Sequence, residues 1–142
     1  MSIWFNENLS QPDLPDLTTG TMSSTLGMEW VAFGNDYLEI RMPVDQRTLQ
    51  PYGLLHGGAS CALAETIGSI GSHLVTDPEK FLSVGLEINA NHISSVRSGW
   101  VTGRAVPIHL GKSTHVWDIR ITSEDGKLVC ISRLTVAIIP KK

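Results

Sequence analysis

The sequence predicts an α+β fold in which one long helix is wrapped by a curved antiparallel β-sheet. Residues 57–75 repeat apolar side chains at helical spacing and contain almost no charge. The segments on either side change to a period of two, which is typical of strands. The order is two strands, a buried helix and then three or more antiparallel strands, and 142 residues fit a single domain over residues 1–142.

Composition and charge narrow the function classes. Apolar residues make up 42% of the chain and charged residues 18%, which is an ordinary globular balance. The net charge of −3 provides no basic field for nucleic acid. The first residues lack the basic and apolar regions of a secretory signal, and residues 48–76 hold too many Gly, Ser and His for a membrane span. We therefore expect a cytoplasmic protein that binds neither nucleic acid nor membrane.

The cysteines and histidines show no metal-binding pattern. Cys61 and Cys130 are far apart, and both lie in apolar segments that predict reduced, buried thiols. The five histidines lack metal-ligand spacing, and the chain has no phosphate-binding loop, dinucleotide fingerprint or serine nucleophile elbow. We expect no metal and no cofactor.

The elements before the helix are short. Residues 1–25 are polar and irregular, with room for one short helical turn. Residues 28–33 and 37–43 flank a Gly-Asn-Asp turn and predict a β-hairpin. Residues 44–55 predict a loop.

The helix over residues 57–75 is expected to be buried. Leu63, Ile67, Ile70 and Leu74 form one stripe, and the other faces carry mostly small uncharged residues. A helix that is apolar nearly all round needs cover on every side, and a single sheet covers only one. A second subunit would supply the rest, so we expect an oligomer.

Four strands are expected after the helix. In the first, Val84, Leu86, Ile88 and Ala90 alternate with polar residues and are predicted to share one face. Residues 100–110 predict a second strand, in which Pro107 indicates an edge or a bulge. The third strand is expected to bury its odd-numbered residues, and a last strand runs over residues 128–139. The odd-numbered residues are His115, Trp117, Ile119 and Ile121.

Glu65 is the candidate catalytic residue. It is the only Asp, Glu, Lys or Arg between Thr48 and Thr76, and no cation lies three or four positions away. A buried, unpaired carboxylate is costly, so Glu65 reaches a pocket, pairs with a distant cation, or is protonated. Carboxylates in such surroundings also serve as catalytic acids and bases.

The predicted helix start is the second candidate feature. The first N–H groups of a helix have no intrahelical partner, and together with the helix dipole they can stabilise an oxyanion. A flexible helix entry is the simpler interpretation of the Gly57-Gly58 pair alone. Gly57 and Glu65 are eight residues apart, or about 12 Å along a helix. If both act on one carbonyl, they must come from two different chains.

The motifs together resemble a known family. The runs over residues 50–60 (QPYGLLHGGAS), 63–69 (LAETIGS) and 84–92 (VGLEINANH) are similar to hotdog-fold thioesterases of the 4-hydroxybenzoyl-CoA type. Residues 107–111 (PIHLG) and 132–135 (SRLT) extend this similarity. Within that family, the sequence resembles the branch acting on 1,4-dihydroxy-2-naphthoyl-CoA in menaquinone synthesis and its proofreading sister in siderophore synthesis.

The resemblance implies a role for each matching residue. Glu65 matches the carboxylate that acts as nucleophile or as general base, and Gly57 matches the amide that polarises the thioester carbonyl. Gln50 and His56 match polar groups near the thioester, and Ser69 matches a helper one turn after the carboxylate. The acyl and CoA sites match Val84, Asn91, His92, Ile93, Ser94, Ile108, His109, Leu110, Gly111, Lys112 and Ser113.

The implied substrate is an acyl-CoA, with an aromatic acyl group favoured, and the implied assembly is a tetramer of two hotdog dimers. Three positions depart from the family: Lys112 stands where Arg is frequent, His115 where Gln is frequent, and Tyr52 where Phe is usual.

Taken from its apolar strand alone, His92 would be a core or interface histidine.

Two other functions are compatible with the sequence. A hotdog dehydratase or hydratase also carries an acidic residue on its central helix, but the spacing from His56 to Glu65 favours a thioesterase. A non-catalytic acyl-CoA-binding protein is the third possibility. Sensors of that type usually carry a DNA-binding domain, for which this chain has no room.

Overall fold

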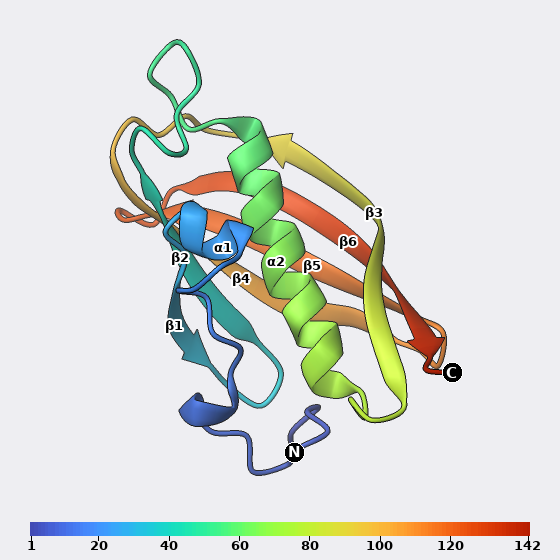
Figure 1. Cartoon of the computed structure of the whole chain (residues 1–142). Helices are drawn as coiled ribbons and strands as arrows, with labels where there is room; N and C mark the ends of the chain where they lie inside the picture. Colours follow the sequence, from blue (N-terminus) through green and yellow to red (C-terminus); the bar gives the residue numbers. More distant parts are fainter.

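Six antiparallel strands form one sheet that curves around a central helix (Figure 1). The structure, a computed structural model, describes residues 1–142. The spatial order of the strands is β1-β2-β4-β5-β6-β3, so β1 and β3 are the two edges. The strands are β1 (Glu29–Phe33), β2 (Leu38–Val44), β3 (Phe81–His92), β4 (Gly99–Leu110), β5 (Thr114–Ser123) and β6 (Leu128–Pro140). The predicted α+β architecture and its strand order along the chain are confirmed.

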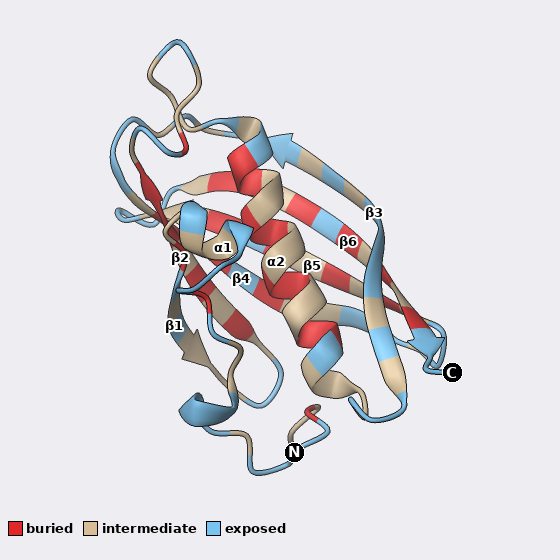
Figure 2. Ribbon diagram, in the orientation of Figure 1, coloured by how far each residue is buried: buried red, intermediate tan, exposed pale blue.

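The central helix α2 (Gly57–Val75) has the predicted bounds and crosses the concave face of the sheet (Figure 1). Its sheet-facing side is the buried one, and the opposite side is intermediate or exposed (Figure 2). Leu63 and Ile67 are fully buried, whereas Ile70 and Leu74 are only partly buried. The inner side of the helix also carries small residues. At Gly71 there is no space for a side chain, because a Cβ there would come within 2.7 Å of the Trp117 ring. The helix therefore lies close against the sheet.

The N-terminal segment supplies core residues that the sequence did not predict. It carries two short helical turns, η1 (Gln11–Asp13) and α1 (Met22–Thr25), where one was expected. Trp4 and Leu17 are each 4% exposed and belong to the core. The Trp4 indole donates to the Gly34 carbonyl at 2.8 Å, and the Phe5 N–H donates to the Leu74 carbonyl at 2.8 Å. The chain's own N-terminal segment therefore covers part of the helix.

The prediction that Val84 and Leu86 share one face of β3 with Ile88 is wrong. The register of β3 against β6 shifts between Gly85 and Glu87, so Leu86 is an extra, bulged residue. Val84 and Leu86 are 44% and 61% exposed, while Ile88 packs against the core. A bulge exchanges the two faces of a strand, which a sequence-based period of two cannot show.

The remaining strands follow the prediction. The register of β4 shifts between Pro107 and His109, which confirms a bulge at the proline. The predicted inner row of β5 is buried, with Trp117 fully inside the core. No helix of the structure is long and apolar enough to cross a membrane.

Candidate active site

A cavity of about 310 Å³ opens at the N-terminus of α2. Its volume lies at the lower end of the range for small-molecule sites. It is formed between the loop before α2, the first turn of α2, and the segment that follows β3. The lining residues are Gln50, Leu54, Leu55, Gly57, Ser60, His92, Ile93, Ser94, Ser95 and Val129. The cavity thus brings together Gln50, Gly57, His92, Ile93 and Ser94, five of the predicted site residues.

The helix start leaves one backbone donor available in this cavity. Nδ1 of His56, the N-cap residue, accepts from the Gly58 N–H at 2.8 Å. The Ala59 and Ser60 N–H groups both donate to the His56 carbonyl. The Gly57 N–H has no carbonyl to bind within the helix and no backbone partner outside it. The first turn therefore leaves the Gly57 amide unpaired beside the cavity, at the positive end of the helix dipole.

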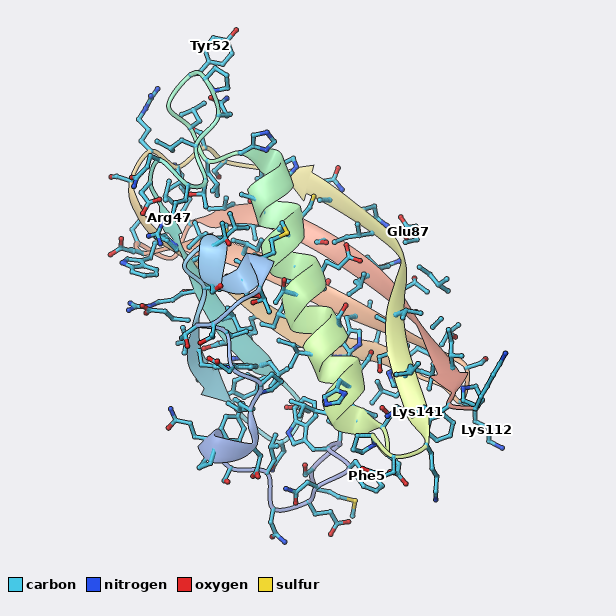
Figure 3. The ribbon with its side chains drawn as sticks, viewed as in Figure 1. Phe5, Arg47, Tyr52, Glu87, Lys112 and Lys141 are labelled. Atoms are coloured by element: carbon cyan, nitrogen blue, oxygen red, sulfur yellow. The ribbon has the colours of Figure 1, made fainter.

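The Gln50 side chain is oriented by its own loop. Its Oε1 accepts hydrogen bonds from the backbone N–H of Tyr52 and, at 3.5 Å, of Leu54. The amide NH₂ is the end of Gln50 that remains free to donate. Tyr52 itself lies at the tip of the loop, 84% exposed, and points away from the molecule (Figure 3).

Glu65 does not line this cavity. It is half-buried on the side of α2 that faces β3, and its carboxylate lies against the backbone of Gly85. No hydrogen bond or ion pair within the protomer holds it. The distant ion pair that the sequence left open is therefore absent. Cys61 lies one helical turn before Glu65. Burial is the main cause that raises the pKa of its thiol, and the negative charge of Glu65 is the second. Ser69 is also half-buried, one turn later on the same helix.

His92 is an exposed residue of the cavity, so it is not a core histidine of the protomer. A Cβ on Gly57 would come within 2.8 Å of His92 Nε2, which shows how closely the ring approaches the helix start. The neighbouring segment is fixed to β6, because Ile93 N–H donates to the Val129 carbonyl and Ser94 Oγ to the Leu128 carbonyl.

The other predicted ligand-binding residues lie elsewhere in the protomer. The β4–β5 turn, residues 111–113, adjoins His115, which contacts Ser72 near the end of α2. Ser72 and Gly57 are fifteen positions apart, or about 22 Å along the helix. Lys112 projects from this turn at the opposite end of the molecule from Tyr52 (Figure 3). Asn91 is exposed close to the cavity, and Val84 is exposed on β3. The predicted ligand-binding residues are thus divided between the two ends of α2, and Glu65 and Ser69 lie between them on the helix.

Some residues of the site region were not singled out from the sequence. Ser60, 1% exposed, and Val129 line the cavity. Gly85 adjoins the Glu65 carboxylate. Ser60 and Gly85 lie inside the runs that resemble the family, so the sequence could have indicated both residues through that resemblance. No group of three or more His, Cys, Asp or Glu side chains is arranged to hold a metal ion.

Comparison with known proteins identifies the family of this chain. Residues 52–130, more than half of the chain, match the thioesterase superfamily model. The 1,4-dihydroxy-2-naphthoyl-CoA hydrolase of Escherichia coli is 53% identical over 84% of this chain and 88% of that protein. The proofreading thioesterase EntH of Cronobacter turicensis is 45% identical over 96% of this chain and 98% of that protein.

Solved structures agree in fold along nearly the whole chain. A thioesterase variant from Pseudomonas aeruginosa has a TM-score of 0.92 at 48% identity, covering 99% of this chain and 100% of that one. A thioesterase from Haemophilus influenzae has a TM-score of 0.90 at 50% identity, covering 97% and 95%. The chain therefore belongs to the thioesterase superfamily, has the hotdog fold of its relatives, and is a thioester hydrolase.

Proposed function

We propose that this protein hydrolyses aromatic acyl-CoA thioesters at a site shared by two subunits. The observation that carries the proposal is the separation of two complementary groups. The free Gly57 amide and the unpaired Glu65 carboxylate lie about 12 Å apart along α2. One protomer therefore has the parts of a thioesterase site but does not bring them together.

The Gly57 amide is suited to the thioester carbonyl. As the carbonyl carbon is attacked, negative charge develops on its oxygen, and an oriented N–H at a helix N-terminus stabilises that charge. The Gln50 NH₂ group lines the same cavity and can donate to the oxygen or to an attacking water. His56 Nδ1 is occupied by the Gly58 N–H, so His56 acts here by holding the first turn in place.

Glu65 of the other subunit would supply the electron pair or the base. As a nucleophile, one carboxylate oxygen bonds to the carbonyl carbon, the C–S bond breaks, and the thiolate of CoA leaves. Water then hydrolyses the mixed anhydride and regenerates the carboxylate. As a general base, Glu65 removes a proton from water while the water oxygen attacks the carbonyl carbon. The C–S bond of the tetrahedral intermediate then breaks, and the CoA thiolate leaves and takes up the proton that Glu65 held. Both routes use the same carboxylate and the same Gly57 donor.

The free edge of β3 supports a two-fold dimer. This twelve-residue strand has no partner on its outer side, and Leu82, Val84 and Leu86 on it are 44–61% exposed. Long apolar edge strands pair with other strands unless they are protected. Pairing two antiparallel copies along β3 would set the Gly57 end of one subunit beside the residue 108–113 end of its partner. Such a dimer reunites the two groups of predicted residues, and two dimers would form the tetramer that the resemblance implies.

The substrate class rests on the relatives and on this arrangement. A relative at 53% identity is named 1,4-dihydroxy-2-naphthoyl-CoA hydrolase, so an aromatic acyl group of that kind, and a place in menaquinone synthesis, are proposed for this chain. In the dimer, the partner's Ile108–Ser113 segment would bind CoA. Lys112 would offer a phosphate a single positive charge, since an ammonium lacks the two-pronged geometry of Arg.

The test is thiol release from aromatic and aliphatic CoA thioesters. We expect Glu65→Gln to lower kcat by at least about 100-fold, because it keeps the size of the side chain and removes its charge. Glu87→Gln is the matched control, since this carboxylate points away from the helix on the outer side of β3 (Figure 3). Near-normal turnover by Glu65→Gln would reject the assignment. Binding of acyl-CoA without thiol release by the unmodified chain would favour a carrier or a dehydratase.

A further inference from the structure

The Glu65 carboxylate lies directly against the backbone of one residue, Gly85 on β3. The three atoms nearest to a Cβ built on Gly85 all belong to Glu65. That Cβ would overlap Oε1 and lie 3.4 Å from Cδ and 4.0 Å from Cγ. The carboxylate therefore occupies the space that any side chain at position 85 would need.

The backbone conformation does not explain a glycine at this position. Gly85 is not among the five glycines with positive φ, so other residues could adopt its backbone angles. Glycine in the interior of a strand weakens it and often marks a close approach by another group. Here the approaching group is the end of the Glu65 side chain.

The bulge beside Gly85 controls a second carboxylate. Gly85 pairs with Val136 and Glu87 with Thr135, which leaves Leu86 as the extra residue. If β3 were regular, with Leu86 paired in the place that Glu87 takes opposite Thr135, the alternation of the strand would turn position 87 toward α2, as it does position 85. With the bulge, Glu87 points outward, where its carboxylate accepts from Asn89 Nδ2 at 3.2 Å (Figure 3). The bulge thus keeps a like charge away from Glu65.

We propose that Gly85 and the adjoining bulge of β3 form a positioning device for Glu65, in which the missing side chain at Gly85 sets the place of the reactive carboxylate. The proposal rests on the catalytic role of Glu65 proposed above. In this scheme Gly85 does not contact the substrate and acts only through Glu65. Bulges recur beside active sites because they redirect side chains locally.

The test is the Gly85→Ala variant, assayed for thiol release. The new methyl group would push the carboxylate away from β3, and displacement of a reacting group by about 1 Å can lower the rate about 100-fold. We expect kcat to fall by about 10- to 100-fold while KM changes by less than about twofold. Ser83→Ala is the matched control, because Ser83 lies two residues earlier on β3 and its Oγ has no hydrogen-bond partner. It should retain normal kcat.

A second variant separates positioning from a general structural effect. Glu65→Asp withdraws the carboxylate from Gly85 by one methylene group. In that background, Gly85→Ala should lower kcat by less than about twofold, because the two changes share one contact and are not additive. Thermal unfolding should be cooperative in every variant.

Three results would overturn the proposal. The first is a normal kcat in Gly85→Ala. The second is an equal loss of kcat when Gly85→Ala is made in the unmodified chain and in the Glu65→Asp variant. The third is failure of Gly85→Ala to fold. Each would count against positioning even where Glu65→Gln is inactive. An active Glu65→Gln variant would instead reject the catalytic role of Glu65 itself, so the two proposals fail in different ways.

Discussion

Ser72 on α2 and His115 on β5 are joined by a buried hydrogen bond, with 2.9 Å between Oγ and Nδ1. Trp117 Nε1 donates to the same Oγ at 2.8 Å, so Ser72 joins both side chains of β5 to α2. Ser72 is fully buried and His115 is 2% exposed. Because His115 is the second residue of β5, its bond to Ser72 joins the strand to the central helix close to the β4–β5 turn.

The first prediction concerns the stability of the fold at acidic pH. Burial lowers the pKa of His115 below its usual 6.5, and the nearby His109 adds to this effect against the opposing Gly111 hydrogen bond. The unfolded chain then binds more protons than the folded chain at low pH. The free energy of unfolding should therefore fall as pH decreases below about 6.5, and this contribution should level off below the lowered pKa.

Urea unfolding of the unmodified chain and of His115→Gln, measured from pH 7.5 to pH 5, tests this. Gln can bond to Ser72 but does not titrate, so the variant should lose less stability over that interval. His109→Gln is the control for a neighbouring exposed histidine and should retain most of the dependence. Parallel pH curves for the unmodified chain and His115→Gln would contradict the assignment to His115.

The second prediction concerns the shared active site. A side chain in Gly57→Val would fill the space beside His92 and block access to the amide, and Glu65→Gln removes the carboxylate. Each variant alone should be inactive. A hybrid dimer of the two has one site with both substitutions and one with neither, so random mixing should restore about a quarter of the unmodified activity.

The mixing experiment needs co-expression or refolding of the two variants together. Native mass spectrometry should detect hybrid dimers in the same sample. Hybrids without any recovery of thiol release would show that Gly57 and Glu65 act within a single subunit, or that one of them is not part of the site.

The third prediction uses Cys61 as a reporter of the Glu65 charge. Burial is the main cause that raises the pKa of Cys61, and the negative charge of Glu65 is the second. Glu65→Gln should therefore shift the pH dependence of Cys61 alkylation to lower pH. The pKa should still exceed its usual value of 9.0, because the burial remains.

Alkylation is best followed in a Cys130→Ala background. Burial raises the pKa of the Cys130 thiol to about 11, and the residue is fully buried, so it should react only on unfolding. Glu87→Gln removes a carboxylate from the outer side of β3 and should leave the Cys61 profile unchanged. An identical profile in Glu65→Gln would mean that Glu65 carries no charge near the thiol in solution.

Elements defined by their own periodicity were predictable from the sequence. The bounds of α2 follow from its apolar repeat, and the buried row of β5 follows from strict alternation. The choice of Glu65 as candidate catalytic residue follows from its isolation in an uncharged helix. The separation of Gly57 and Glu65 was predictable for the same reason, since it depends only on the rise of one helix. In each case the signal and its consequence lie within one segment.

The tertiary structure alone decided the features that depend on a partner segment. Trp4 and Leu17 join the core from a stretch without periodicity, because their partners are distant in the sequence, as the Trp4 bond to Gly34 shows. The bulge at Leu86 exists only in relation to β6, so no property of β3 by itself could show that Val84 and Ile88 face opposite ways. The approach of Glu65 to Gly85 likewise joins residues twenty positions apart. A sequence determines such contacts physically, but they become visible only when both partners are placed in space.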